Sequence, residues 1–182
     1  MKQRILFVCL GNICRSPAAE AMFRALVERE GHGDMFVIDS AGTYGGHSGE
    51  RSDVRMRRAA AVLGIEMTHL ARQVREEDFE RFDYIIAVDD NNYESLFRLA
   101  PDREAGKKIY RFSEFLRHHP DWFFVPDPYY EGHEGFELVL DLLEDGCNTL
   151  LEEICKKVKE TQYTHAIVVI LPSKMVNYNR QW

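Results

Sequence analysis

The chain opens with a short apolar run that leads through a tight loop into a helical pattern, and this order constrains the fold more than any other feature. The apolar run is Ile5-Leu6-Phe7-Val8, and residues 9–17 read CLGNICRSP. Apolar side chains then recur at helical spacing over residues 18–29. A buried strand that passes directly into a helix is typical of α/β proteins, in which helices cover both faces of a parallel sheet.

The remainder of the chain continues this alternation of buried strands and helical segments. Strands are predicted near residues 4–9, 35–40, 83–88 and 108–110, and helices near 16–30, 52–64, 91–99 and 134–159. We therefore expect an α/β fold: one domain with a parallel sheet of about four strands and helices on both faces. Ligands of such sheets bind beyond the carboxyl ends of the strands, where the loop after Val8 would lie.

The last residues, 161–182, are predicted to form an extension of unknown role. The segment His165 to Leu171 is rich in β-branched residues and is followed by Pro172. This composition favours a strand that ends at the proline. The sequence thus predicts an extra strand at a sheet edge, either of the same molecule or of a neighbour.

Composition narrows the class of protein. The 182-residue chain has a net charge of −7 and no basic run, so nucleic acid is not an expected partner. No stretch approaches the roughly 20 apolar residues of a membrane helix, so a membrane is not expected either. The spacing of Cys9, Cys14, Cys147 and Cys155 suits neither a zinc site nor a disulfide along one helix. We expect a reducing, cytoplasmic setting, with no metal and no cofactor.

The loop itself has the chemistry of an anion cradle. Helix N-termini and successive backbone amides attract anions, and Gly11 and Asn12 tolerate the turns that such a cradle requires. Arg15 adds a planar fork that suits two phosphate oxygens. The same field stabilises a thiolate, which predicts a nucleophilic Cys9. Ser16 could donate to that sulfur or cap the following helix.

The cradle is not that of a nucleotide-binding protein, because no Gly-x4-Gly-Lys pattern occurs. The string CLGNICRSPAAEAMFR instead resembles the signature of the low-molecular-weight protein tyrosine phosphatases. Later segments resemble the same family in the same order: residues 38–43 (IDSAGT), 69–73 (HLARQ), 78–85 and 127–130 (DPYY). The resemblance covers about residues 4–159 and implies a phosphatase domain over residues 1–160 with a flavodoxin-like fold.

The resemblance also implies a reaction. A metal-independent hydrolase of this kind removes phosphate from phosphotyrosine, and from small aryl phosphates, through a phosphocysteine intermediate. Cys9 is then the nucleophile and Arg15 holds the phosphate oxygens. Expulsion of a phenolate calls for a general acid. Asp127 is the candidate because Pro126 and Pro128 restrict its loop, and because the aspartate at the matching position has that role in the family.

Other residues receive roles by the same resemblance. Ser40 and His69 correspond to positions that brace the loop, and Cys14 to a second cysteine that can trap oxidised Cys9 as a disulfide. Tyr129 and Tyr130 correspond to entrance residues that are candidate phosphorylation sites. The expected substrate-binding residues are Leu10, Gly11, Asn12, Ile13, Cys14, Ser16, Tyr44, His47, Tyr129 and Tyr130.

One position departs from the family pattern. Many members carry an aromatic residue six positions after the serine that corresponds to Ser40, on the wall of the pocket opposite the paired tyrosines. Here that position is Gly46, with Tyr44 two residues before it and His47 directly after it. Tyr44 and His47 are the candidates to replace the missing ring.

Three other classes of protein share parts of this pattern. Arsenate reductases that resemble this family need a redox cysteine pair in mid-chain, and no cysteine lies between Cys14 and Cys147. Phosphoarginine phosphatases of this scaffold have threonine where the chain has Ile13, whose apolar side chain favours a phenyl ring. A noncatalytic phosphotyrosine-binding module would not need both Cys9 and Asp127. The expected partners are phosphotyrosine-containing proteins or peptides, with inorganic phosphate and vanadate-type anions as inhibitors.

Overall fold

The computed structural model describes the backbone of residues 2–170 and the side chains of residues 2–161. The chain divides into two compact units, Met1–Thr149 and Leu150–Trp182. In the first unit, four parallel strands form one sheet in the spatial order β2-β1-β3-β4, which confirms the predicted sheet. The strands are β1 (Gln3–Cys9), β2 (Phe36–Gly42), β3 (Tyr84–Ala87) and β4 (Ile109–Arg111).

The strand order places a crevice at the end of β1. The chain crosses from β1 to β2 on one side, and β3 and β4 lie on the other side of β1. The carboxyl end of β1 is therefore the topological switch point, where α/β sheets open to ligands. Cys9 is the last residue of β1 and pairs in register with Gly42 of β2.

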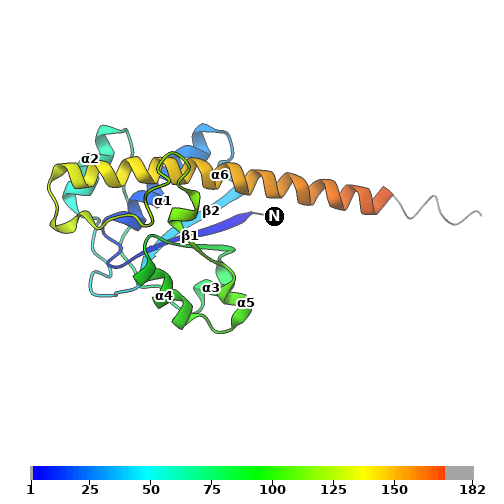
Figure 1. Ribbon diagram of the computed structural model, residues 1–182, viewed down its shortest axis with the longest axis horizontal. Coiled ribbons are helices and arrows are strands. Elements are labelled where there is room, and N and C mark those ends of the chain that lie inside the picture. The colour runs from blue at the N-terminus through cyan, green and yellow to red at the C-terminus, as the bar shows by residue number, and fades with distance from the viewer. Residues whose placement is uncertain (1, 171–182) are drawn as a thin grey trace, which may run out of the picture. The chain divides into compact units, whose positions relative to one another are not determined.

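Helices cover both faces of the sheet (Figure 1). One face carries α1 (Arg15–Arg29), with α2 (Val54–Val62) beside it. Helix α6 (His133–Ile170) also packs here around Cys147, whose thiol contacts the carbonyl oxygen of Ala19 in α1 at 3.9 Å. The other face carries α3 (Asp78–Arg81), α4 (Asp90–Leu99) and α5 (Arg103–Gly106).

The core explains why the first strand reads as a continuous apolar run. Phe7 packs edge-on against Phe23 of α1, with ring centroids 5.8 Å apart. Its neighbours Leu6 and Val8 belong to the apolar cluster on the opposite face, with Phe79 among its members. Since β1 is buried on both faces, both alternating sets of side chains must be apolar.

The expected extra strand over residues 165–171 is wrong for the residues that the structure describes. In the second unit α6 continues as a helix to Ile170, and Leu171 lies outside the described residues. Extending an existing helix adds one hydrogen bond per residue without a new nucleation step, whereas a strand needs a partner. β-Branched composition is a weak guide in that contest. Within residues 2–170, no helix has the length and hydropathy of a membrane span.

Candidate active site

The segment between β1 and α1 folds back over the sulfur of Cys9. The backbone amide of Asn12 donates to Cys9 Sγ at 3.2 Å, and Ser16 Oγ lies 3.0 Å from the same sulfur. Cys14 occupies the N-cap position of α1, and no side chain makes a capping hydrogen bond to this helix. Of the two roles considered for Ser16, the structure therefore gives it the contact with sulfur. The sulfur thus lies next to the Asn12 amide and the Ser16 hydroxyl, close to the N-terminus of α1.

Asn12 holds the loop in a conformation that few residues adopt. Its φ of 56° lies in the left-handed region, where Asn is better tolerated than most residues. Its side-chain amide donates to Ser16 Oγ at 2.9 Å and to Ser40 Oγ at 3.0 Å. The side-chain oxygen of Asn12, Oδ1, accepts a hydrogen bond from the backbone amide of Arg72 and lies next to His69 Nε2, both at 2.9 Å. The structure thus brings the predicted supports Ser40 and His69 against Asn12.

A buried carboxylate, which the sequence analysis missed, lies beneath these supports. Glu20 Oε2 accepts from Ser40 Oγ at 2.7 Å and lies 3.0 Å from His69 Nδ1. Burial alone would raise the pKa of Glu20, but the hydrogen bonds and the charge of His69 outweigh it and hold that pKa below its ordinary value. Glu20, Asp39 and His69 are close enough to bind a metal, yet each already has a partner, since Arg72 pairs with Asp39 at 2.9 Å.

Arg15 is buried and bound on two sides. Its Nη1 lies 2.6 Å from Asp89 Oδ2 and its Nη2 lies 2.9 Å from Asp127 Oδ2. Nη1 also donates to the Val125 carbonyl oxygen at 3.1 Å. Burial alone would lower the pKa of Arg15, but the charges of Cys9, Asp127 and Asp89 raise it above its ordinary value, so the group stays cationic.

Asp89 has two roles in the structure. Its Oδ1 accepts from the Asn92 amide at 2.8 Å and caps α4, while its Oδ2 pairs with Arg15. Asp89 follows β3, the neighbour of β1, by two residues. The rule that parallel strands end at one edge of a sheet was the signal that could have revealed this second role.

Asp127 brings a carboxylate to the rim of the loop. It caps the short 3-10 helix Pro128–Tyr130, because its Oδ1 accepts from the Tyr129 amide at 3.1 Å. Its Oδ2 faces Arg15, and the side chain is 43% exposed. The carboxylate therefore reaches both water and the charged centre of the site.

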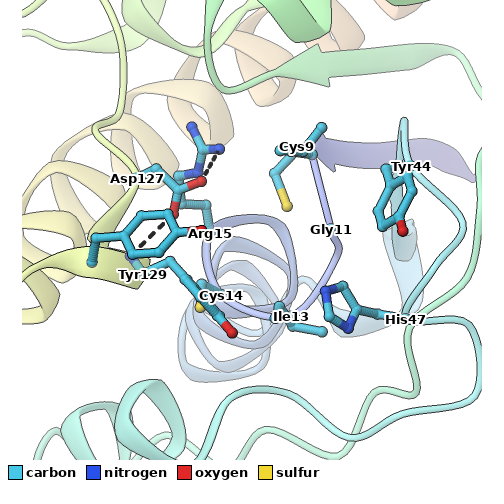
Figure 2. Close-up of a pocket in the computed structure, with 11 residues that line it drawn as sticks. Cys9, Gly11, Ile13, Cys14, Arg15, Tyr44, His47, Asp127 and Tyr129 are labelled. Carbon is cyan, nitrogen blue, oxygen red and sulfur yellow. Dashed lines mark hydrogen bonds and ion pairs between the residues drawn. The ribbon is translucent and has the colours of Figure 1, made fainter.

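These parts surround a pocket of about 230 Å³ above the Cys9 sulfur. In Figure 2, Tyr44 and His47 lie on one side of Cys9 and Tyr129 lies on the other. Asn12, Ser16, Ser40 and His69 do not line the pocket; they support the loop. The lining residues are Cys9, Leu10, Gly11, Ile13, Cys14, Arg15, Tyr44, His47, Asp127, Tyr129 and Tyr130.

Tyr129 is held by an arginine that the sequence did not single out. Arg55 Nη1 donates to the Tyr129 carbonyl oxygen at 2.9 Å, and its guanidinium lies 5.2 Å from the centroid of the Tyr129 ring. Asp53, the cap of α2, pairs with Arg55 at 2.7 Å. Asp53 is a recognisable helix cap in the sequence, but nothing local reveals the contact between Arg55 and Tyr129.

Cys14 is a buried thiol beside the nucleophile position. Burial is the main cause that raises its pKa well above the ordinary value, and the negative charges of Asp53 and Cys9 add to the effect. The Cys14 side chain is therefore held as a neutral thiol. All four cysteines are free, and Cys9, Cys14 and Cys147 are buried.

Comparison with known proteins agrees with this geometry. The model of the family described as Low molecular weight phosphotyrosine protein phosphatase matches residues 4–160. A Streptomyces coelicolor low molecular weight protein-tyrosine-phosphatase is 43% identical over 161 residues, which cover 87% of this chain and 98% of that protein.

Solved structures agree in fold. A protein tyrosine phosphatase from Entamoeba histolytica, crystallised with Hepes in its active site, has a TM-score of 0.83 at 39% identity and covers 86% of this chain and 99% of its own. A Drosophila arginine phosphatase has a TM-score of 0.76 at 31% identity and covers 85% and 98%. From the family match and the identity to its relatives, the chain belongs to the low molecular weight phosphotyrosine protein phosphatase family.

Proposed function

We propose that this protein hydrolyses phosphotyrosine in proteins or peptides, and small aryl phosphates, through a phosphocysteine intermediate. The observation that carries the proposal is the position of the Cys9 sulfur. The sulfur accepts a hydrogen bond from the Asn12 amide at 3.2 Å. It lies on the floor of a pocket that the Asp127 carboxylate also lines. Membership of the family supports the same reaction.

In the first step the Cys9 thiolate attacks phosphorus and the bond from phosphorus to the aryl oxygen breaks. The loop amides and the Arg15 guanidinium stabilise the negative charge on the equatorial oxygens. Protonated Asp127 gives its proton to the leaving phenolate. Arg15 Nη2 contacts Asp127 at 2.9 Å, so a bound phosphate oxygen would compete with the carboxylate for that guanidinium.

In the second step water attacks the phosphocysteine. Asp127, now ionised, takes a proton from that water, the bond from sulfur to phosphorus breaks, and inorganic phosphate leaves. The Cys9 thiolate is thereby restored. Since phosphate is the product and fits the cradle, phosphate and vanadate-type anions should inhibit. The backbone donors and Arg15 supply the positive potential that the reaction requires.

Two further expectations belong to this proposal. The catalytic domain is assigned to residues 1–160, because the family match spans residues 4–160 and the lining residues that the structure describes lie between Cys9 and Tyr130. A reducing setting such as the cytoplasm suits a catalytic thiol, and all four cysteines are free.

The second candidate substrate is phosphoarginine, because a structural neighbour of the same fold is a Drosophila arginine phosphatase. Ile13 lines the pocket and offers an apolar surface. Such a surface suits a phenyl ring better than a cationic guanidinium, which would lose hydration there without gaining a polar partner. Faster hydrolysis of phosphoarginine than of phosphotyrosine would reverse the assignment.

The test is a series of aryl phosphates whose leaving groups differ in basicity. Asp127→Asn should slow phenyl phosphate hydrolysis by about 10²–10⁴-fold and 4-nitrophenyl phosphate hydrolysis far less, because a good leaving group needs little protonation. Cys9→Ser should abolish turnover while a phosphotyrosine peptide still binds.

Asp121→Asn is the matched control, since Asp121 is an exposed carboxylate on the same segment of chain. It should behave like the wild type with both leaving groups. If Asp127→Asn slowed hydrolysis equally for both leaving groups, Asp127 would not be the general acid. If Cys9→Ser kept part of its turnover, the reaction would not require a phosphocysteine intermediate.

A further inference from the structure

The loop after β2 contains a glycine whose side-chain position is filled by another residue. A Cβ built on Gly46 would lie 2.3 Å from Cε1, Cζ and Oη of Tyr44. Real Cβ atoms do not approach ring atoms this closely, so any side chain at position 46 would displace the ring. Gly46 is not among the glycines with positive φ, so its backbone does not itself require glycine. A side chain at position 46 therefore requires the Tyr44 ring to move from the place that it occupies.

The backbone of Tyr44 is joined directly to the nucleophile loop. The Tyr44 amide donates to the Leu10 carbonyl oxygen at 2.9 Å, and the Thr43 amide donates to that of Cys9, also at 2.9 Å. These two bonds set the origin of the Tyr44 side chain relative to the sulfur. Movement of the ring then depends only on its own torsions and on what it packs against.

The ring borders the pocket and keeps a free face. It is 57% exposed, although it packs edge-on with His47 at 6.1 Å between centroids. Hydrogen bonding between His47 Nδ1 and Glu50 at 2.8 Å holds that neighbour in place. Figure 2 shows Tyr44 and Tyr129 on opposite sides of Cys9, so a group bound to the sulfur side of the pocket would emerge between two aromatic rings.

We propose that Tyr44 and Gly46 form an interdependent pair that sets the selectivity of the site for aryl phosphates. Tyr44 supplies the second aromatic side of the entrance, and Gly46 supplies the space in which its ring lies. The inference rests on the proposed function for the identity of the aryl substrate. A side chain at position 46 should therefore have the same effect as removal of the Tyr44 ring.

The test measures binding, which does not depend on turnover. Dissociation constants for phenylphosphonate and methylphosphonate would be measured by calorimetry for the wild type, Tyr44→Ala, Gly46→Ala and the double variant. The wild type should prefer the phenyl ligand, and each single variant should reduce that preference by about five- to tenfold, since an aromatic pair contributes on this scale. The double variant should lose no more than Tyr44→Ala alone, because both changes remove the same contact.

Two control variants separate the pair from general effects. Tyr44→Phe keeps the ring and should retain the preference. Gly132→Ala adds a methyl group that meets nothing within 4 Å and should leave both dissociation constants unchanged.

The inference is overturned if Gly46→Ala keeps the phenyl preference, if both phosphonates weaken alike, or if the two losses add in the double variant. Hydrolysis of a phosphotyrosine peptide is assayed in parallel. If the variants show the expected loss of phenyl preference but the wild type does not hydrolyse the peptide, the proposed function is refuted and the inference about Tyr44 and Gly46 is retained. Hydrolysis without the binding effect would do the reverse.

Discussion

Asn12 joins the backbone of the nucleophile loop to the polar groups behind it. Its φ of 56° turns the loop, and its side chain contacts Ser16, Ser40, His69 and the Arg72 amide. The loop is thus held by one side chain that satisfies four partners. Asn12 does not line the pocket, so we expect it to affect catalysis by placing the backbone amides that face the Cys9 sulfur.

Two substitutions separate the backbone role of Asn12 from that of its side chain. Asn12→Gly keeps access to positive φ but loses the side-chain contacts, which should cost about 1–3 kcal/mol of stability because buried partners are left unpaired. Asn12→Ala also strains the backbone and should cost roughly 1–2 kcal/mol more. Urea unfolding measures the stabilities, and kcat/KM for an aryl phosphate should fall in the same order. Equal stability of Asn12→Gly and wild type would show that the side-chain contacts contribute nothing.

The segment between β4 and Asp127 has little regular structure but is fastened at both ends. Near its start, the buried Asp145 of α6 accepts from the amides of His118 and His119 at 2.8 and 3.2 Å, and lies 2.8 and 3.1 Å from their Nδ1 atoms. Near its end, the Val125 amide donates to the Val88 carbonyl oxygen at 2.8 Å. The position of the rim carboxylate therefore depends on α6 as well as on the sheet.

This fastening should depend on pH. Burial alone would raise the pKa of Asp145, but hydrogen bonds from His118 and His119 outweigh it and lower that pKa. Asp145 thus contributes stability above its unfolded pKa of about 3.9 and loses it as pH falls through the lower folded value. The hydrogen bond to Asp145 raises the pKa of His119, and the charge of Asp141 adds to this effect, although burial opposes it. His119 thus contributes stability below its unfolded pKa of about 6.5, and this stability is lost as pH rises through its higher pKa in the folded protein.

Asp145→Asn should therefore lower the melting temperature most between about pH 4 and pH 6.5. Losing the charged hydrogen bonds should lower the free energy of unfolding by about 2 kcal/mol, which corresponds to a fall in melting temperature of roughly 4–8 °C for a chain of this size. Thermal unfolding of wild type and variant across pH 3 to 9 measures the difference, with Asp121→Asn as the exposed control. A difference that stays constant across that range would contradict the linkage.

At the level of the whole molecule, the site belongs to the first compact unit. Among the described residues, those that line the pocket lie between Cys9 and Tyr130, whereas the second unit begins at Leu150. The family match nevertheless continues to residue 160. The boundary of the functional domain is therefore best tested beyond the end of the match.

Truncation after Glu160 should leave kcat/KM within about twofold of the full chain, because the pocket-lining residues that the structure describes all precede Glu131. Activity and thermal unfolding of the shortened and full chains measure this directly. A folded but inactive shortened chain would mean that residues 161–182 take part in the reaction. That result would contradict the assignment of the catalytic domain to residues 1–160.

The sequence alone predicted what depends on neighbouring residues. Alternating apolar runs predicted the four parallel strands, and the order of strand, loop and helix around Cys9 predicted an anion cradle, because helix ends and backbone amides act locally. The failure at residues 165–170 has the same origin. Local β propensity favoured a strand there, but α6 extends to Ile170.

Only the tertiary structure showed which distant groups meet. Asp89 and Asp127 converge on Arg15, and Glu20 lies behind the loop. Asp89 meets Arg15 because the parallel strands β1 and β3 end at one edge of the sheet, whereas Asp127 comes from a long loop and Glu20 from α1. The sequence named Gly46 as a departure and Tyr44 as a candidate replacement, but only packing showed that the ring of one fills the side-chain space of the other. Such contacts are set by side-chain torsions and loop geometry, which neither composition nor spacing along the chain determines.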